Sequence, residues 1–169
     1  MGSLSVNRKA VIAQRLLRFS VSLAFVMGQA AAQTPARPMV LAVTVLTSLS
    51  DGDMIELGIA AKVIDQVVRL AALARYAGCA GVVASALEAH ELRRELGSDF
   101  KIVTPGVRPA GTRAGDQARV LTPKEAIAAG ANYLVVGRPI LEAADPPRAA
   151  NEIVREIAEA ELALATVRP

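Results

Sequence analysis

Aromatic side chains are scarce in this chain of 169 residues: it has no Trp, two Tyr and three Phe, 3% in all, whereas 53% of its residues are hydrophobic. A core of this composition has to be built from Ala, Val, Leu and Ile. Such a mixture suits strands that are buried on both faces and covered by helices, which predicts the α/β class. The length is sufficient for one domain with a sizeable core.

Cysteine and histidine are nearly absent, with one of each, Cys79 and His90. A single cysteine excludes an internal disulfide, and the place of Cys79 between an expected helix end and an apolar strand favours a packing role. His90 lies in the stretch ALEAHELRREL, where its neighbours at helical spacing form no cluster of metal ligands. We therefore interpret it as a surface histidine and expect no metal site.

Acidic residues are missing from residues 1–38, which contain five basic ones: Arg8, Lys9, Arg15, Arg18 and Arg37. Residues 39–169 contain the remaining 14 of the 19 basic residues and all 16 acidic ones, a net charge of −2. The pI of about 9.4 thus reflects the N-terminal segment. Nucleic-acid binding is disfavoured, because the domain has neither a basic stripe nor an aromatic platform.

Residues 1–38 differ from the rest and are treated as a separate segment, with the domain at 39–169. A basic start, an apolar run from Phe19 to Met27 and small residues at 30–32 are typical of a secretory signal peptide. The run is too short to span a bilayer. A basic amphipathic helix, or a segment joined to the domain by truncation or rearrangement of a longer gene, is the alternative. We expect a cytoplasmic location, with export as the alternative.

From residue 39 onward, apolar strand patterns alternate with amphipathic helix patterns. We expect strands at 39–47, 80–85, 100–104 and 132–137, helices at 59–76, 87–96, 122–130 and 145–163, and a long loop at 105–120. The alternation predicts a parallel sheet with right-handed crossovers. An open doubly wound sheet and a (β/α)₈ barrel both use this order. A barrel needs eight strands, so the chain would supply half of one.

Glycine and arginine come together after the third and fourth expected strands. Ligands of both architectures lie at the carboxyl ends of the strands. Arg108 follows the third strand and Gly137-Arg138 the fourth. Two guanidinium forks and a glycine amide suit a phosphate group, and Gln117 could reach it from the long loop. Ordinary surface arginines are the alternative.

Small hydroxyl side chains follow the first expected strand. Thr47, Ser48 and Ser50 could hydrogen-bond a ligand there, but capping of a helix or turn by Ser50 and Asp51 explains this stretch equally well.

Three stretches carry a family resemblance: VLAVTVLTS, GVVASALEAHELR and FKIVTPGVRPAGTRAGDQARVLTPKEAIAAGANYLVVGRPILEAADP. They resemble the carboxyl-terminal half of bacterial orotidine 5′-phosphate decarboxylases, from about Pro38 to the end of the last helix. The resemblance implies a (β/α)₈ barrel that works as a homodimer. It also implies conversion of orotidine monophosphate to uridine monophosphate and CO₂, in de novo pyrimidine synthesis, without a metal or organic cofactor.

The same resemblance implies roles for five residues. Arg108, Gln117, Gly137 and Arg138 would bind the phosphate of the nucleotide, and Thr47 would lie over the pyrimidine or its neighbouring loop.

The sequence departs from the family in its catalytic motif, an Asp-x-Lys-x-x-Asp run after an earlier strand. The nearest string is AAKVID, with Lys62 and Asp65 but with Ala60 at the first aspartate position. We interpret it as a solvated helix face. The sequence therefore predicts phosphate binding without decarboxylation by the chain alone, and self-association through the open half-barrel. A non-catalytic nucleotide-binding half-barrel, or an exported protein of another role, is the alternative.

Overall fold

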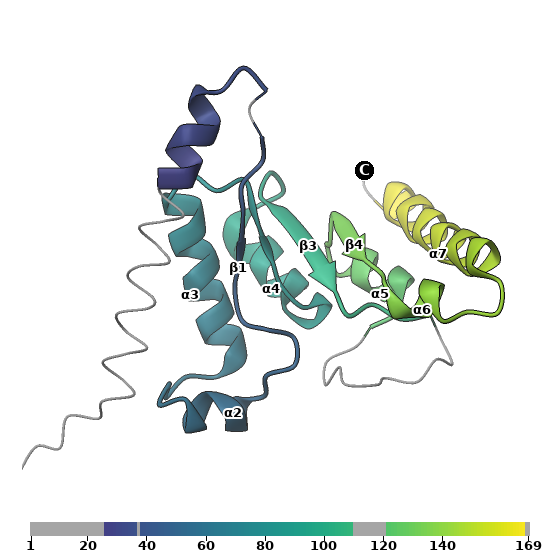
Figure 1. Ribbon diagram of the computed structural model, residues 1–169, viewed down its shortest axis with the longest axis horizontal. Helices are drawn as coiled ribbons and strands as arrows, with labels where there is room; N and C mark the ends of the chain where they lie inside the picture. Colours follow the sequence, from purple (N-terminus) through teal and green to yellow (C-terminus); the bar gives the residue numbers. More distant parts are fainter. Residues whose placement is uncertain (1–25, 37, 110–120, 168–169) are drawn as a thin grey trace, which may run out of the picture.

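Four short strands form one parallel sheet in the computed structural model, which describes residues 26–36, 38–109 and 121–167 (Figure 1). The strands are β1 (Leu41–Val43), β2 (Gly81–Val83), β3 (Lys101–Pro105) and β4 (Tyr133–Val135), and they lie in the order β1-β2-β3-β4. Each strand pairs with its neighbour in the chain across a helical crossover. The expected α/β fold with four parallel strands is therefore confirmed.

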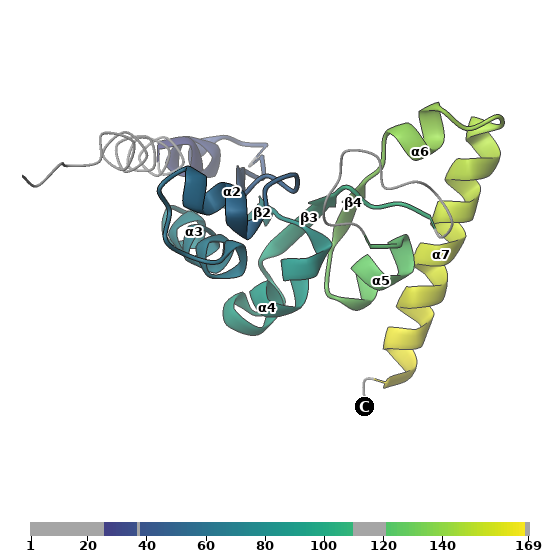
Figure 2. The same ribbon diagram turned by 90° about the horizontal axis from the view of Figure 1, so that it is seen from below.

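Most helices lie on one side of this sheet. They are α2 (Asp51–Glu56), α3 (Val63–Tyr76), α4 (Ala86–Leu96), α5 (Pro123–Ala128), α6 (Arg138–Leu141) and α7 (Pro146–Val167). Seen from below, α3, α4, α5 and α7 lie in an arc (Figure 2). Residues 26–33 form a further helical turn that lies close to the end of α3. A Cβ added to Gly28 would lie 2.7 Å from the Ala77 carbonyl oxygen.

Several expected element boundaries were wrong. The strand expected at 39–47 is confined to Leu41–Val43, because a turn closed by Leu49 N–H on the Leu46 carbonyl follows it. The helix expected from residue 59 begins at Val63, since the carboxylate of Asp51 accepts a hydrogen bond from the Val63 N–H at 2.7 Å. The helices α2 and α6 were not expected at all. Both are short, so neither gives a recurring apolar pattern.

The two faces of the sheet differ in burial. Val82, Ile102 and Thr104 face the helices and are at most 1% exposed. Successive side chains of a strand point to opposite faces, and the other face includes Val43 at 60% and Val135 at 53% exposure. The expectation of strands buried on both faces is wrong for β1 and β4, because the helices of the described residues cover one face only.

A capping box starts α5, as the sequence predicts. The Thr122 hydroxyl accepts a hydrogen bond from the Glu125 N–H at 3.2 Å, and the Glu125 carboxylate accepts one from the Thr122 N–H at 2.8 Å. Pro123 occupies the first turn, where its missing N–H costs nothing. The bonds from the Thr122 backbone and hydroxyl hold the pKa of Glu125 below its ordinary value. This box fixes the point at which the chain returns from residues 110–120.

The guanidinium of Arg93 joins two segments that precede neighbouring strands. It is a half-buried side chain of α4, and burial lowers its pKa. Its acceptors are the carbonyl oxygens of Gly97, Ser98, Phe100 and Gly130 and the side-chain oxygen of Asn132, all at 2.7–3.0 Å. The Asn132 side chain also accepts from the Ile102 N–H at 2.9 Å. Arg93 thereby fixes the start of β4 relative to the start of β3.

Arg93→Met is expected to lower the free energy of unfolding by about 2–4 kcal/mol, because several carbonyl oxygens lose a charged donor together. Chemical denaturation followed by circular dichroism measures the change. Arg94→Met is the matched control, since Arg94 is the next residue of α4 but 62% exposed and paired only on the surface. Equal unfolding midpoints for the two variants would contradict the role of Arg93.

Glu125→Ala is expected to lower stability at neutral pH by less than about 1 kcal/mol, because the exposed capping carboxylate is screened by solvent. The folded-state pKa of Glu125 is depressed from 4.5, so its contribution is present above that ordinary value. The contribution is lost as the pH falls through the depressed folded-state pKa, and the unfolding curves of variant and wild type should converge there. Glu161→Ala, on the exposed face of α7, is the control. A difference that persists in acid would argue against the box.

Candidate functional site

The residues predicted to bind a ligand follow the carboxyl ends of their strands, at one edge of the sheet. Thr47 comes after β1, Arg108 after β3, and Gly137 with Arg138 after β4. The parallel pairing of β3 with β4 makes the last two segments neighbours. Thr47 lies farther away, since β2 separates β1 from β3. Gln117 lies outside the described residues.

Arg108 is held at the base of the loop that leaves β3. Gly106 turns the chain with φ of 75°, a left-handed conformation that favours glycine. Val107 is 2% exposed and packs in a small core with Ala126 and Ala131. The Arg108 N–H donates to the Leu121 carbonyl at 3.1 Å, which brings the two ends of the segment 109–120 together. The backbone of Arg108 is thus fixed next to the start of α5.

The Arg108 side chain is half-buried, and its Nε atom is buried without a hydrogen-bond partner in the part of the chain that the structure describes. A buried donor without an acceptor costs free energy, because water no longer solvates it. An anion at this edge of the sheet would supply the acceptor.

Gly137 and Arg138 form the start of α6 rather than a simple turn. Gly137 is the N-cap residue, with φ of −111°, and its carbonyl accepts from the N–H groups of Ile140 and Leu141 at 2.9 and 3.1 Å. A Cβ on Gly137 would meet no described atom within 4 Å. Both Gly137 and Arg138 are exposed. The sequence signal for α6 was Pro139, a residue common in the first turn of a helix.

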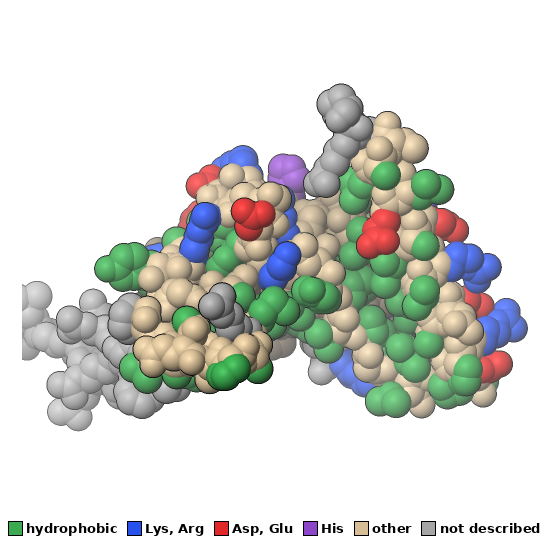
Figure 3. Space-filling model, turned by 90° about the horizontal axis from the view of Figure 1, so that it is seen from above, with side chains coloured by type: hydrophobic (Ala, Val, Ile, Leu, Met, Phe, Trp, Pro, Cys, Tyr) green, Lys and Arg blue, Asp and Glu red, His purple; other side chains and the backbone are tan. Residues whose placement is uncertain are grey.

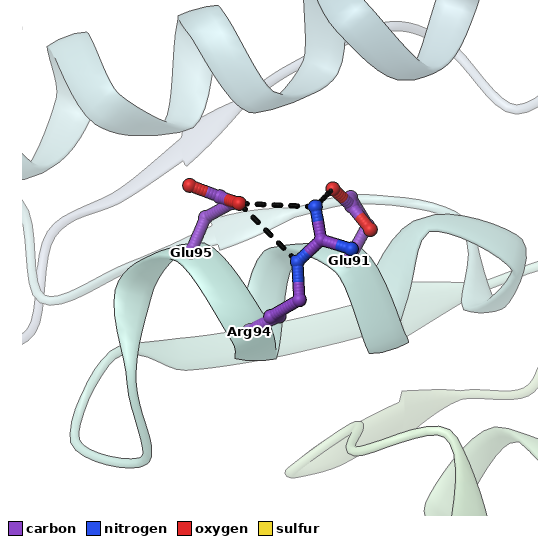
Figure 4. Close-up of polar contacts among 3 residues, drawn as sticks. All are labelled: Glu91, Arg94 and Glu95. Atoms are coloured by element: carbon purple, nitrogen blue, oxygen red, sulfur yellow. Dashed lines mark hydrogen bonds and ion pairs between the residues drawn. The ribbon is translucent and has the colours of Figure 1, made fainter.

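Other arginines near the sheet are used by the protein itself. Arg93 is engaged by backbone carbonyls, and Arg75 donates to the Leu96 carbonyl at 2.7 Å. Arg94 lies between Glu91 and Glu95 on α4, and its pKa is raised by the hydrogen bond to Glu95 and by the nearby charge of Glu91 (Figure 4). These three side chains are therefore poor candidates for binding an external anion.

The capping explanation for the segment after β1 is confirmed. The Ser50 hydroxyl accepts from the Asp53 N–H at 3.3 Å and starts α2. The Asp51 carboxylate caps α3 through Val63. Hydrogen bonding to Ser50 lowers the pKa of Asp53. These side chains serve helix starts, so neither Ser50 nor Asp51 is a strong candidate for contacting a ligand.

The expectations for four other residues are also confirmed. Cys79 is 5% exposed within the main core, and burial raises the pKa of its thiol. His90 is exposed on α4. Lys62 and Asp65 are exposed at the start of α3, as expected for a solvated helix face.

The described residues lack two features. They contain no group of three or more His, Cys, Asp and Glu side chains placed to hold a metal ion. In the same ranges, no helix has the length and apolar character needed to cross a membrane.

Known proteins match most of this chain. An orotidine 5′-phosphate decarboxylase from Idiomarina loihiensis is 55% identical over 122 residues, which are 72% of this chain and 53% of the relative. The corresponding enzyme from Rhodospirillum rubrum is 57% identical over 122 residues, 72% of this chain and 49% of the relative. The chain therefore spans about half the length of the curated relatives it matches.

A solved structure also matches most of this chain. The crystal structure of orotidine 5′-phosphate decarboxylase from Lactobacillus acidophilus superposes with a TM-score of 0.61 and 42% identity, over 75% of this chain and 53% of that one. The fold of the chain is thus that of four β/α units of a (β/α)₈ barrel. The family model for orotidine 5′-phosphate decarboxylase / HUMPS matches residues 19–153. The chain belongs to the orotidine 5′-phosphate decarboxylase / HUMPS family.

Proposed function

We propose that this chain binds a pyrimidine nucleoside 5′-monophosphate of the orotidine or uridine type through its phosphate group. The proposed site lies where β3 and β4 end, with the guanidinium groups of Arg108 and Arg138 and the amide of Gly137 on the phosphate. Gln117 would complete it from the adjoining segment, and Thr47 would lie toward the pyrimidine. We also propose that the chain does not decarboxylate the nucleotide by itself.

The buried Nε atom of Arg108 is the observation that carries the binding proposal. This donor has no acceptor among the described residues, yet its backbone is anchored on both sides. A phosphate oxygen would satisfy it with a charge-assisted hydrogen bond, which is about twice as strong as a neutral one. The relatives, named for orotidine 5′-phosphate decarboxylation, make a nucleotide phosphate the natural anion.

Open space at Gly137 supports the same site from the neighbouring strand. No described atom lies within 4 Å of the position of an added Cβ, so a ligand can approach the backbone here. Arg138 is exposed on the same turn. Two segments that are adjacent only through β3–β4 pairing would thus contact one phosphate from two sides.

The absence of an Asp-x-Lys-x-x-Asp run from the sequence supports the second part of the proposal. Decarboxylation leaves a carbanion-like centre that a positioned lysine protonates while aspartates orient that lysine. Preorganised charges of this kind supply most of the barrier reduction in such a site. Lys62 and Asp65 do not replace them, because they are exposed at the start of α3.

Arg108→Lys is expected to weaken uridine monophosphate binding about 10- to 100-fold, because an ammonium group cannot reproduce the fork of hydrogen bonds. Isothermal titration calorimetry measures the affinity, with uridine as the ligand that lacks the phosphate. Arg94→Lys is the matched control on the outer face of α4 and should bind like the wild type. Equal affinities for uridine and uridine monophosphate would contradict the phosphate site, as would an unchanged affinity of Arg108→Lys.

The purified chain is expected to release no CO₂ from carboxyl-labelled orotidine monophosphate, because it lacks the proton donor. Trapping of labelled CO₂ measures this directly. Release that is abolished by Arg138→Ala would show that the chain decarboxylates the nucleotide at this site, and would refute the second part of the proposal. The same preparation should still bind uridine monophosphate, so the binding proposal and the proposal of no decarboxylation are tested independently.

A further inference from the structure

Both ends of the sheet leave a strand edge uncovered within the described residues. The ladder pairs β1 with β2, β2 with β3 and β3 with β4, so β1 and β4 each pair on one side only. Proteins usually protect such edges with charged residues, proline or bulges. Here β1 reads Leu-Ala-Val and β4 reads Tyr-Leu-Val. Neither strand carries a protecting residue.

On the sheet face away from the helices, an apolar row runs between these two edges, with Lys101 on the same face at the start of β3. Val43, Val83, Val103 and Tyr133 form one row across all four strands. In this row Val43 is 60% and Tyr133 is 50% exposed, and Val135 beyond it is 53% exposed. Hydrophobic side chains gather at the middle of the molecule and over the side that carries α7 (Figure 3). Exposed apolar surface of this extent marks an interaction site.

The helix layer is incomplete at the same two ends. Beyond β4, α7 packs against α5 and buries Ile153 and Ala160, but Val154 and Leu162 are 62% and 68% exposed. Before β1, the turn at 26–33 leaves Val26 62% exposed. Each end of the sheet thus presents a strand edge together with a helix that has exposed apolar side chains.

We propose that two copies of this chain close into one eight-stranded ring, in which β4 of each copy pairs in parallel with β1 of the other. A two-fold axis along the ring keeps all strands pointing the same way, so the new seams repeat the parallel pairing within each copy. An eight-stranded barrel has an interior that side chains just fill. The matched part of this chain corresponds to about half (53%) of the solved structure that it resembles.

Closure by a second copy accounts for the uncovered strand edges and the exposed apolar row together. It covers both edges, buries the row of Val43, Val83, Val103 and Tyr133 against its symmetry mate, and places α7 beside the helical turn at 26–33 of the other copy. Pairing of β1 with β1, by contrast, would be antiparallel and would leave β4 uncovered. Pairing that did not close would build a filament. The inference does not depend on nucleotide binding.

Light scattering after size-exclusion chromatography tests the ring, with an expected mass of twice 17.6 kDa for the full chain. Val135→Asp and Val43→Lys are each expected to give the single-copy mass, because every seam then buries an unpaired charge. Leu87→Asp is the matched control: Leu87 is 51% exposed but lies on α4, over the middle of the sheet. It should keep the two-copy mass.

Measuring the mass of a mixture of Val135→Asp and Val43→Lys is the decisive experiment. A mixed ring has one unaltered seam and one seam with opposite charges, so the two-copy mass should return in the mixture alone. Three results would overturn the proposal. The wild type could be a monomer, its mass could grow without limit with concentration, or both single variants could keep the two-copy mass. A wild-type chain that stays single and binds a separate polypeptide supplying four β/α units would overturn it as well.

Hydrogen exchange of the wild type keeps the test independent of how the variants fold. The amides of Leu41–Val43 and Tyr133–Val135 should become protected as protein concentration rises, whereas those of β2 should not change. Protection of β1 and β4 that is independent of concentration would also overturn the ring.

Discussion

The described structure depends most on the position of one charged group, the guanidinium of Arg93. Short parallel strands make few hydrogen bonds with one another, and β4 pairs with β3 through three residues. Arg93 adds five bonds that join the segments before β3 and β4 to α4. Because the strands are rigid over so short a length, fixing their starts also fixes their carboxyl ends. Contacts at the amino ends of β3 and β4 thus contribute to the relative placement of the segments that carry Arg108 and Arg138.

The Arg93 contacts lie at the amino ends of the strands, and the proposed phosphate ligands lie at the carboxyl ends. This separation explains how the proposed site can be complete in a chain that spans about half the length of its relatives. The proposed phosphate ligands come from two adjacent β/α units, and the small core of Val107, Ala126 and Ala131 lies beneath them. None of these contacts requires a strand outside the four that are present. Catalysis in the family is a different matter, since it uses a motif from an earlier strand. In the proposed function, binding and turnover therefore separate along the chain.

The sequence predicted the order of strands and helices because local chemistry determines it. The capping pair Thr122 and Glu125 and the apolar runs of the strands act within a few residues of each other. The start of α3 could not be predicted, since it depends on a contact between Asp51 and Val63, which are distant in sequence. The short helices α2 and α6 give no recurring apolar pattern and were missed for that reason. The site residues were chosen by their positions after strands and by family resemblance. That the Nε atom of Arg108 is buried without an acceptor among the described residues is visible only in three dimensions.

One strand connects the proposed site with the proposed ring. The carboxyl end of β4 carries Gly137 and Arg138, and its outer edge is one side of the seam. A strand that pairs on one side exchanges and frays more readily than one that pairs on both. Closure would therefore order the turn that presents Arg138 and reduce the entropy lost when a phosphate binds. Assembly and nucleotide affinity should then be linked through β4, although the seam and the phosphate site share no direct contact.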